Sequence, residues 1–572
     1  MTASPGGARR KGGVIGNVVG GFVAGLYSVP EGIGYASLAG INPMLGIYSG
    51  MVPVAVAAAT TGSVLMMSTL TSAIALTMGG VLADGGYTGS QVSQAVFTLA
   101  LLSGALMIAL GLLKLGKAVN FVSNAVMTGF VMGVAILIMV GKFDNIFGYD
   151  PTGVTNKVLK GIDILVHPGN WNLTTTVIGV GTIALGFALK AVPALTRYAL
   201  VIVVVLGTAI VWIFNVPTTT LADEAAIATG LAALPIPHGV EDLPSVTLVP
   251  GLLIGSLSIA IVALAQGAGI RPAFPNPDGT SADSSRDFLG QGLGNLTGAF
   301  FQSTPAGGSL SRTAVSADGG ATGRAAGYVA AASVLLLVLV LGNAVGHIPE
   351  AVIGGLLFVI GVELVLGRLP DARLAWQAGA TPRTLLIVTL VLTLTVPLQW
   401  AVFGGVVLSL LAYVGASSQQ ARLQRITHDD TGWTLTDDIP AVLPPDEPVL
   451  LRYTGPNFFA VVAPLHERLP QPSPDYPGVV IIDVGALQRF SSTMLKQLND
   501  YACHLASSGS AIVLTGVTDT GRETLARAGT ADLLGKDNIL PPDPHIIVAI
   551  ETAFRRGQTR LCDLASPPPA QH

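Results

Sequence analysis

Long apolar runs fill the chain as far as residue 416, whereas the remainder has the mixed composition of a soluble domain. A helix needs about 20 predominantly apolar residues to cross a bilayer, and a discontinuous helix needs fewer. By this measure the chain has about seven segments before residue 216 and about seven after residue 247. They cover residues 14–38, 43–60, 63–83, 91–113, 119–143, 173–191 and 198–215, then 249–270, 286–303, 309–323, 325–345, 349–367, 383–397 and 400–416. The pattern therefore predicts a polytopic α-helical membrane protein.

An odd number of segments in each half places the second copy upside down relative to the first, as in transporters built from inverted repeats. We expect these repeats at residues 14–215 and 249–416. Positive loop charges favour the cytoplasm, and the connection from residue 216 to 246 contains no Lys or Arg. The connections assigned to the cytoplasm carry Lys114, Lys117, Lys190, Arg197, Arg271, Arg324, Arg368, Arg373 and Arg383, against Lys142, Lys157 and Lys160 in an outside loop. Both termini are therefore expected in the cytoplasm of a multi-pass plasma membrane protein.

Composition supports the membrane assignment and excludes other classes. Only 11% of residues are charged and the mean hydropathy is +0.65, whereas about a quarter of residues are charged in a soluble protein. A net charge of -4 gives no reason to invoke nucleic acid. The two cysteines, Cys503 and Cys562, have no metal-ligand spacing. Residues 14–38 are expected to be a retained span rather than a signal peptide, and we find no motif for a cofactor, a metal or a catalytic nucleophile.

Strand-like and helix-like runs alternate after the last apolar segment and predict a small α/β domain over residues 447–557. A cytoplasmic flank (1–13), a linker (417–446) and a flexible tail (558–572) complete the expected organisation. Within the domain the predicted strands are 449–453, 458–459, 479–483 and 511–514, and the predicted helices begin at 463 and cover 492–507 and 522–528.

Two hydroxyl-rich segments occupy equivalent places in the two halves and resemble broken helices. The first is Ser68-Thr69-Leu70-Thr71-Ser72, and the second is Gly307-Gly308-Ser309-Leu310-Ser311-Arg312. The first turn of a half-helix has unpaired backbone amides and the positive end of the helix dipole, so it can bind an anion. A single serine such as Ser309 would by itself favour a helix N-cap. The matched pair of segments nevertheless favours an anion site.

The first span carries a carboxylate, Glu31, between a proline and two glycines near the middle of the bilayer. A charged group at that depth usually faces a cavity or an ion path. A bound anion beside it would favour the protonated form, so we predict that Glu31 binds a proton during transport. Tyr35, one turn further on, either contacts the substrate or packs. Asp278, Asp283 and Asp287 form no metal-binding pattern.

The stretch from Val29-Pro30-Glu31-Gly32 to Gly46-Ile47-Tyr48-Ser49, together with Gln291-Gly292-Leu293-Gly294-Asn295 and Gly308-Ser309-Leu310-Ser311-Arg312-Thr313-Ala314, resembles two signatures of the SulP anion transporters, also called solute carrier family 26. The C-terminal part is similar to the STAS domain of that family, through Asp483 and Phe490-Ser491-Ser492-Thr493.

This resemblance implies seven plus seven spans arranged as a core domain and a gate domain, an elevator-like movement of the core, a cytoplasmic STAS domain and a homodimer. By position it implies an anion site formed by Glu31, Tyr35, Ser68, Thr69, Leu70, Thr71, Gly308, Ser309, Leu310, Ser311 and Arg312. The chain has Gln266 where many bacterial members have an acidic residue in the eighth span, which weakens the case for sodium coupling. Ser491 replaces the acidic residue before the candidate phosphorylation site Ser492.

We therefore predict a transporter and not an enzyme: a secondary active carrier of a small anion, with sulfate the family default and coupling to protons through Glu31. Bicarbonate, a dicarboxylate such as fumarate, and a channel-like uniporter are alternatives of the same class. A sensor that binds an anion and signals through the STAS domain is the alternative of a different class. The predicted partners are the anion, protons, the lipid bilayer and a second copy of the chain.

Overall fold

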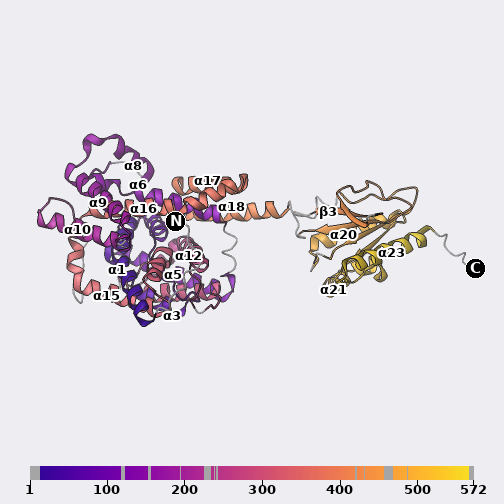
Figure 1. The fold of residues 1–572 in the computed structure, drawn as a ribbon, viewed down its shortest axis with the longest axis horizontal. Helices are drawn as coiled ribbons and strands as arrows, with labels where there is room; N and C mark the ends of the chain where they lie inside the picture. Colours follow the sequence, from indigo (N-terminus) through magenta and orange to yellow (C-terminus); the bar gives the residue numbers. More distant parts are fainter. Residues whose placement is uncertain are drawn as a thin grey trace, which may run out of the picture. The chain divides into compact units, whose positions relative to one another are not determined.

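The computed structural model of the chain describes residues 13–565 except 117–122, 152–155, 194, 225–233, 238, 240–241, 278, 419–421, 431, 456–467, 486 and 488. The chain divides into two compact units, Met1–Leu410 and Leu411–His572. The first is helical apart from two short strands, and the second is an α/β unit built on one sheet (Figure 1).

The helices of the membrane unit follow the predicted segments closely. The first half contains α1 (Val14–Ala39), α2 (Pro43–Tyr48), α3 (Val52–Thr60), β1 (Met67–Thr69), α4 (Ser72–Gly85), α5 (Ser90–Leu112), α6 (Asn124–Val140), α7 (Phe143–Phe147), α8 (Lys157–Val166), α9 (Leu173–Ala191) and α10 (Ala199–Ile213). The second contains α12 (Val249–Ala273), α13 (Ser284–Gly298), β2 (Gly307–Ser309), α14 (Leu310–Asp318), α15 (Ala325–Gly346), α16 (Glu350–Gln377), α17 (Ala380–Thr395) and α18 (Leu398–Ser418).

Length and composition alone identify most of these helices as membrane spans. Within the described residues eight helical stretches are long and apolar enough to cross a bilayer, and four shorter apolar helices accompany them. Polar residues keep α13 out of both groups, and α14, with nine residues, is too short for either. These two helices complete seven segments in each half. The 7+7 prediction is confirmed. Among the described residues it omits the short helices α7 and α8 between the fifth and sixth segments and α11 (Leu221–Glu224) between the halves.

Helix contacts repeat between the two halves as an inverted repeat requires. The first segment, α1, packs against α15 of the second half, and its counterpart α12 packs against α5 of the first half. In the same way α6 packs against α17, while α16 packs against α9. Each contact therefore has a partner generated by exchanging the halves, which is what a pseudo-two-fold arrangement predicts.

These contacts also separate two groups of helices, which we call the core domain (α1–α5 and α12–α15) and the gate domain (α6, α9, α10 and α16–α18). Within the core domain α13 lies against both α5 and α3, and within the gate domain α16 lies against α6, α9 and α10. Figure 1 shows α3, α5 and α12 gathered apart from α6, α8 and α9. The contacts between the groups are fewer, and they involve mainly α1, α4 and α12 on the core side.

The C-terminal unit is a five-stranded sheet in the order β4-β3-β5-β6-β7. Its strands are β3 (Arg422–Asp429), β4 (Gly432–Thr436), β5 (Val449–Thr454), β6 (Val479–Asp483) and β7 (Ala511–Thr515), and its helices are α20 (Ser492–Ser507), α21 (Asp519–Arg527), α22 (Thr530–Leu534) and α23 (Ile546–Ala565). The last three strands in the order are parallel, and β3 pairs antiparallel with β4 and β5. In β6, Val480 and Ile482 face the α20 side while Val479 and Ile481 face α23, so both faces of the sheet are covered by helices.

Two predicted boundaries of this unit are wrong. The linker assigned to 417–446 contains β3 and β4, which belong to the sheet because β3 pairs with β5 over Arg422–Ile426. The tail assigned to 558–572 is helical as far as Ala565, because Leu561 is buried with Ile550 and Ala553 against the sheet. The predicted strand 458–459 and most of the predicted helix from 463 lie outside the described residues.

We predict that Gly516→Ala destabilises the C-terminal unit. Gly516 has φ +77°, and an added Cβ would lie 2.6 Å from the Cα of Gly485, so the substitution adds a backbone clash to the cost of a left-handed conformation. Gly529→Ala is the matched control, because Gly529 has φ +73° with nothing near its Cβ. Limited proteolysis of the purified protein should show earlier cleavage of Gly516→Ala, with a loss of about 2 kcal/mol or more, and equal sensitivity of the two variants would contradict it.

Candidate anion site

Strands β1 and β2 pair with each other at the centre of the core domain. The pairing is antiparallel and matches Met67 with Ser309, Ser68 with Gly308 and Thr69 with Gly307. Unwound backbone inside a membrane protein must find hydrogen-bond partners within the protein, and each strand supplies them to the other. Because α4 and α14 start directly after these strands, the pairing brings the N-termini of both half-helices to the same place.

Hydroxyl side chains cap both half-helices. The Oγ1 of Thr71 accepts from the amide of Ile74 in α4, and the Oγ of Ser309 accepts from the amide of Arg312 in α14, each at 3.4 Å. The N-cap interpretation of Ser309 is therefore correct for one of its contacts. Ser309 also lies 3.2 Å from the Oγ of Ser311, and Ser311 and Leu310 are exposed.

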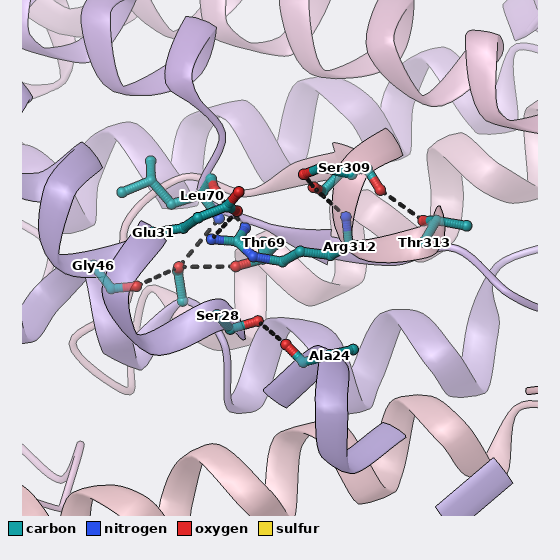
Figure 2. Close-up of polar contacts among 11 residues, drawn as sticks. Ala24, Ser28, Glu31, Gly46, Thr69, Leu70, Ser309, Arg312 and Thr313 are labelled. Atoms are coloured by element: carbon teal, nitrogen blue, oxygen red, sulfur yellow. Dashed lines mark hydrogen bonds and ion pairs between the residues drawn. The ribbon is translucent and has the colours of Figure 1, made fainter. Parts of the chain in front are cut away.

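A buried ion pair joins the first span to the tenth. The Nη2 of Arg312 lies 3.0 Å from the Oε2 of Glu31, and the two side chains are 1% and 3% exposed. Arg312 also donates from Nη1 to the carbonyl of Leu70 at 2.7 Å, and its guanidinium carbon lies 5.9 Å from the ring centre of Tyr35. Figure 2 shows Glu31 and Arg312 facing each other beside Leu70. One cation therefore links α1, α14 and the segment between β1 and α4.

Two polar atoms near this ion pair have no hydrogen-bond partner among the described residues: the Nε of Arg312 and the Oγ of Ser68. Both side chains are buried, with Ser68 2% exposed. Leaving a buried donor unpaired usually costs about 1–3 kcal/mol. Donors of this kind beside two half-helix N-termini are suited to an anion with several oxygen atoms.

The surrounding contacts hold β1 in place. The Oγ of Ser49 donates to the carbonyl of Gly46, accepts from the amide of Leu70 at 3.1 Å and lies 3.2 Å from the Oγ1 of Thr69 (Figure 2). The Oγ1 of Thr71 donates to the Oε1 of Gln266 at 2.8 Å. Thr69 and Thr71 are thus tied to the protein through their side chains, and Gln266 occupies the eighth-span position as a hydrogen-bond acceptor for the site.

Close backbone approach explains two glycines of the first signature. A Cβ at Gly46 would lie 2.0 Å from the carbonyl oxygen of Gly32, and a Cβ at Gly32 would lie 2.8 Å from the carbonyl oxygen of Gly46. Any larger residue would push α2 away from α1, next to Glu31. Glycine is therefore required here for packing.

The structure brings several of the predicted site residues together, and others among them are hydrogen-bonded to the protein itself. Glu31, Tyr35 and the carbonyl of Leu70 all lie against the guanidinium of Arg312. The amide of Gly308 is already used, because it donates to the Oε1 of Gln291 at 3.0 Å. Ser492 is exposed in the first turn of α20, which Ser491 caps, so its phosphorylation stays a prediction.

Sequence reasoning missed the Glu31–Arg312 pair and the role of α13. It set Asp287 aside for lack of a metal pattern, yet Asp287 accepts two hydrogen bonds from Ser63 at 2.7 Å each. The sequence did contain a signal for α13, because the polar residues Asp287, Gln291 and Asn295 are spaced four apart in a membrane segment. No group of three or more potential metal ligands occurs among the residues that the structure describes.

The chain is similar in sequence to a family of known proteins. The profile of the Sulfate permease family matches residues 14–411. Sulfate transporter 4.1 of Arabidopsis thaliana, a chloroplastic protein, is 24% identical over 91% of this chain and 78% of its own length. The putative sulfate transporter YvdB of Bacillus subtilis is 22% identical over 91% of this chain and 95% of its own length.

Solved structures show the same fold. A structure of SLC26A9 superposes with a TM-score of 0.81 at 19% identity and covers 96% of this chain and 91% of its own. The transmembrane domain of the cyanobacterial bicarbonate transporter BicA superposes with a TM-score of 0.57 at 21% identity and covers 69% of this chain and 97% of its own. The fold and these relatives define a multi-pass membrane transporter of anions, not an enzyme. The chain belongs to the Sulfate permease family, and the resemblance to solute carrier family 26 is confirmed.

Proposed function

We propose that this protein carries sulfate into the cell across the plasma membrane, together with protons, and that the anion binds between the N-termini of α4 and α14. The observation that supports this most directly is the buried Arg312, which lies at the start of one half-helix and donates to the carbonyl of Leu70, just before the other half-helix. The names of relatives such as YvdB favour sulfate over other oxyanions.

The site can replace much of the hydration of an anion. The Nε of Arg312 and the Oγ of Ser68 are buried donors without partners among the described residues, and the dipoles of α4 and α14 add partial positive charge. Ser311 is exposed beside them. These groups supply hydrogen-bond donors and positive charge without a metal, and they suit a tetrahedral oxyanion.

Glu31 and the anion compete for the same guanidinium. While Glu31 is ionised it lies 3.0 Å from Arg312 and repels a second negative charge. Protonation removes that charge, leaves Arg312 uncompensated and favours anion binding. The other charged groups that act on Glu31 are Glu363 and Lys190, which pair with each other between α16 and α9. Proton and anion are therefore expected to bind together.

An elevator-like movement is the transport step that this arrangement suggests. All the site residues belong to the core domain, so the site can move as one body. Facing the gate domain, α12 presents Ile261, Val262 and Ala265 to Val126 of α6 and Gly405 of α18, around an apolar cavity. An apolar surface of this kind allows the core to slide.

We further propose a homodimer with both termini and the C-terminal unit in the cytoplasm, and we assign that unit as a STAS domain. Its mixed sheet, with two parallel strand pairs and α20 following the buried strand β6 by one loop, supports the assignment. The match to SLC26A9 extends over 96% of this chain, so it includes the C-terminal unit.

Uptake into proteoliposomes tests the function. Labelled sulfate, bicarbonate and fumarate are offered with and without an inward proton gradient, and empty liposomes provide the background. We expect sulfate uptake that the gradient stimulates. Uptake of bicarbonate or fumarate instead would reassign the substrate, gradient-independent uptake would favour a uniporter, and binding without uptake would favour the sensor.

We predict that Ser311→Glu abolishes sulfate uptake. The new carboxylate would lie in the first turn of α14, where the helix dipole favours a negative charge and where it would take the place of the anion. Ser316→Glu is not a suitable control because Ser316 is buried; Ser285→Glu places the same charge in the first turn of α13, away from Arg312. Wild-type uptake by Ser311→Glu would contradict the assigned site.

A further inference from the structure

Three polar side chains recur at every fourth position of α13: Asp287, Gln291 and Asn295. Residues four apart share one face of a helix. Their exposed fractions are 3%, 1% and 1%, and burying such groups is costly unless they are hydrogen-bonded. The face that they form, which we call the α13 polar face, must therefore have specific partners.

Asp287, at the start of this face, holds the loop that leads into β1. Its Oδ1 accepts from the amide of Ser63 and its Oδ2 from the hydroxyl of Ser63, each at 2.7 Å. Asn276, just after α12, supports the same loop, because its Oδ1 accepts from the amide of Val64 and its Nδ2 donates to the carbonyl of Gly62. The approach to the first half-helix is thereby fixed.

The other two residues hold β2. The Oε1 of Gln291 accepts from the amide of Gly308 at 3.0 Å. The Oδ1 of Asn295 accepts from the amide of Ala306 at 2.6 Å, and its Nδ2 donates to the carbonyl of Ala306 at 2.8 Å. The α13 polar face thus contacts the loop that leads into β1, through Asp287, and the backbone at β2, through Gln291 and Asn295.

Glycines allow the backbone of α13 to pack closely against its neighbours. A Cβ at Gly290 would lie 2.5 Å from the amide nitrogen of Thr61, and one at Gly294 would lie 2.9 Å from the carbonyl oxygen of Pro53. On the α5 side a Cβ at Gly292 would lie 2.8 Å from the carbonyl oxygen of Gly104. With backbone contacts on two sides, α13 has little freedom to shift.

We propose that α13 is the positioning element of the anion site, and that Gln291 is the positioning residue that sets where the first amides of α14 lie relative to those of α4. Gln291 acts on the site through the backbone, because its Oε1 accepts from the amide of Gly308. The proposal rests on the proposed anion site. It extends that function by assigning affinity to a residue outside the two half-helices.

The test is Gln291→Met, which keeps the length and apolar bulk of the side chain and removes the acceptor for Gly308. We expect the sulfate Kd of the purified protein and the uptake KM to rise roughly three- to tenfold, the effect of about one hydrogen bond. Vmax at saturating sulfate stays within about twofold, because a loss of uniform binding raises KM alone. Hydrogen exchange should accelerate at residues 306–310 and stay unchanged at residues 63–70.

Two further variants make the result specific. Thr297→Val is the matched control on the same helix, because the Oγ1 of Thr297 donates only to carbonyls of α13 itself; it should leave Kd and exchange unchanged. Asp287→Asn should give the reverse exchange pattern, with acceleration at residues 63–70. If Gln291→Met does not fold, the exchange pattern of Asp287→Asn still tests whether α13 positions the strands.

A folded Gln291→Met with wild-type Kd and wild-type exchange at residues 306–310 would overturn the positioning role. Acceleration in both segments equally would also overturn it, since that is the result of general loosening. If the wild-type protein binds no sulfate, the proposed function fails, while the two exchange patterns still decide whether α13 positions the strands.

Discussion

Arg312→Met is expected to abolish sulfate uptake and to destabilise the protein. The substitution removes the cation of the anion site and leaves Glu31 buried beside α14 without its partner. Breaking a buried ion pair from one side typically costs about 3–5 kcal/mol, and losing a buried charged contact to a ligand costs about 2–5 kcal/mol or more. Uptake at low sulfate should fall by about 100-fold or more, with a clear drop in the temperature of thermal unfolding.

A double variant separates stability from binding. In Glu31→Gln with Arg312→Met both charges are gone, so most of the lost stability should return while uptake stays absent. Double-mutant analysis isolates such a pairwise coupling. Recovery of uptake together with stability would show that Arg312 serves only the fold, and would contradict its role as the anion ligand.

Glu31→Gln alone is expected to make sulfate uptake independent of pH. The amide cannot take up a proton and cannot neutralise Arg312, so the guanidinium is available to the anion at every pH. In the wild-type protein affinity for sulfate should increase as the pH falls, by up to about tenfold per pH unit for a single linked proton. Uptake of labelled sulfate between about pH 5 and pH 8 measures both profiles.

Glu363→Gln is the matched control for this prediction. Glu363 is a carboxylate of the gate domain that pairs with Lys190 on α9, and it does not contact Arg312. Its replacement should keep the pH dependence of uptake. A flat profile in Glu363→Gln, or an unchanged profile in Glu31→Gln, would place the coupling group elsewhere.

The fold was predictable because a bilayer restricts the structures that a chain can adopt within it. Apolar runs, with shorter ones allowed where a helix is discontinuous, located the fourteen segments. The odd number in each half implied the inverted repeat that contacts such as α1 with α15 and α12 with α5 display. The strands Val479–Asp483 and Ala511–Thr515 were predictable from buried β-rich runs. By contrast, β3 and β4 were assigned to a linker, because strands with one exposed face carry mixed polar residues.

The site was predictable in part for the same reason. Hydroxyl-rich, glycine-flanked breaks in matched spans pointed to the half-helices around Ser68 and Ser309, and a carboxylate in the first span pointed to Glu31. The pairing of Glu31 with Arg312 joins residues 281 positions apart, and local pattern carries no information on such a contact. The polar face of α13 was missed because most of its hydrogen bonds are to backbone amides and carbonyls, for which sequence offers no complementary residue.

The central claim is that Glu31 takes up a proton and leaves Arg312 to the anion when the anion binds. Calorimetric titration of the purified protein with sulfate tests this claim most directly. Repeating the titration in buffers of different ionisation enthalpy gives the number of protons taken up per sulfate bound. We predict that the wild-type protein takes up protons when it binds sulfate and that Glu31→Gln binds sulfate with none. Sulfate binding without proton uptake in the wild-type protein, or equal uptake in both, would contradict the account.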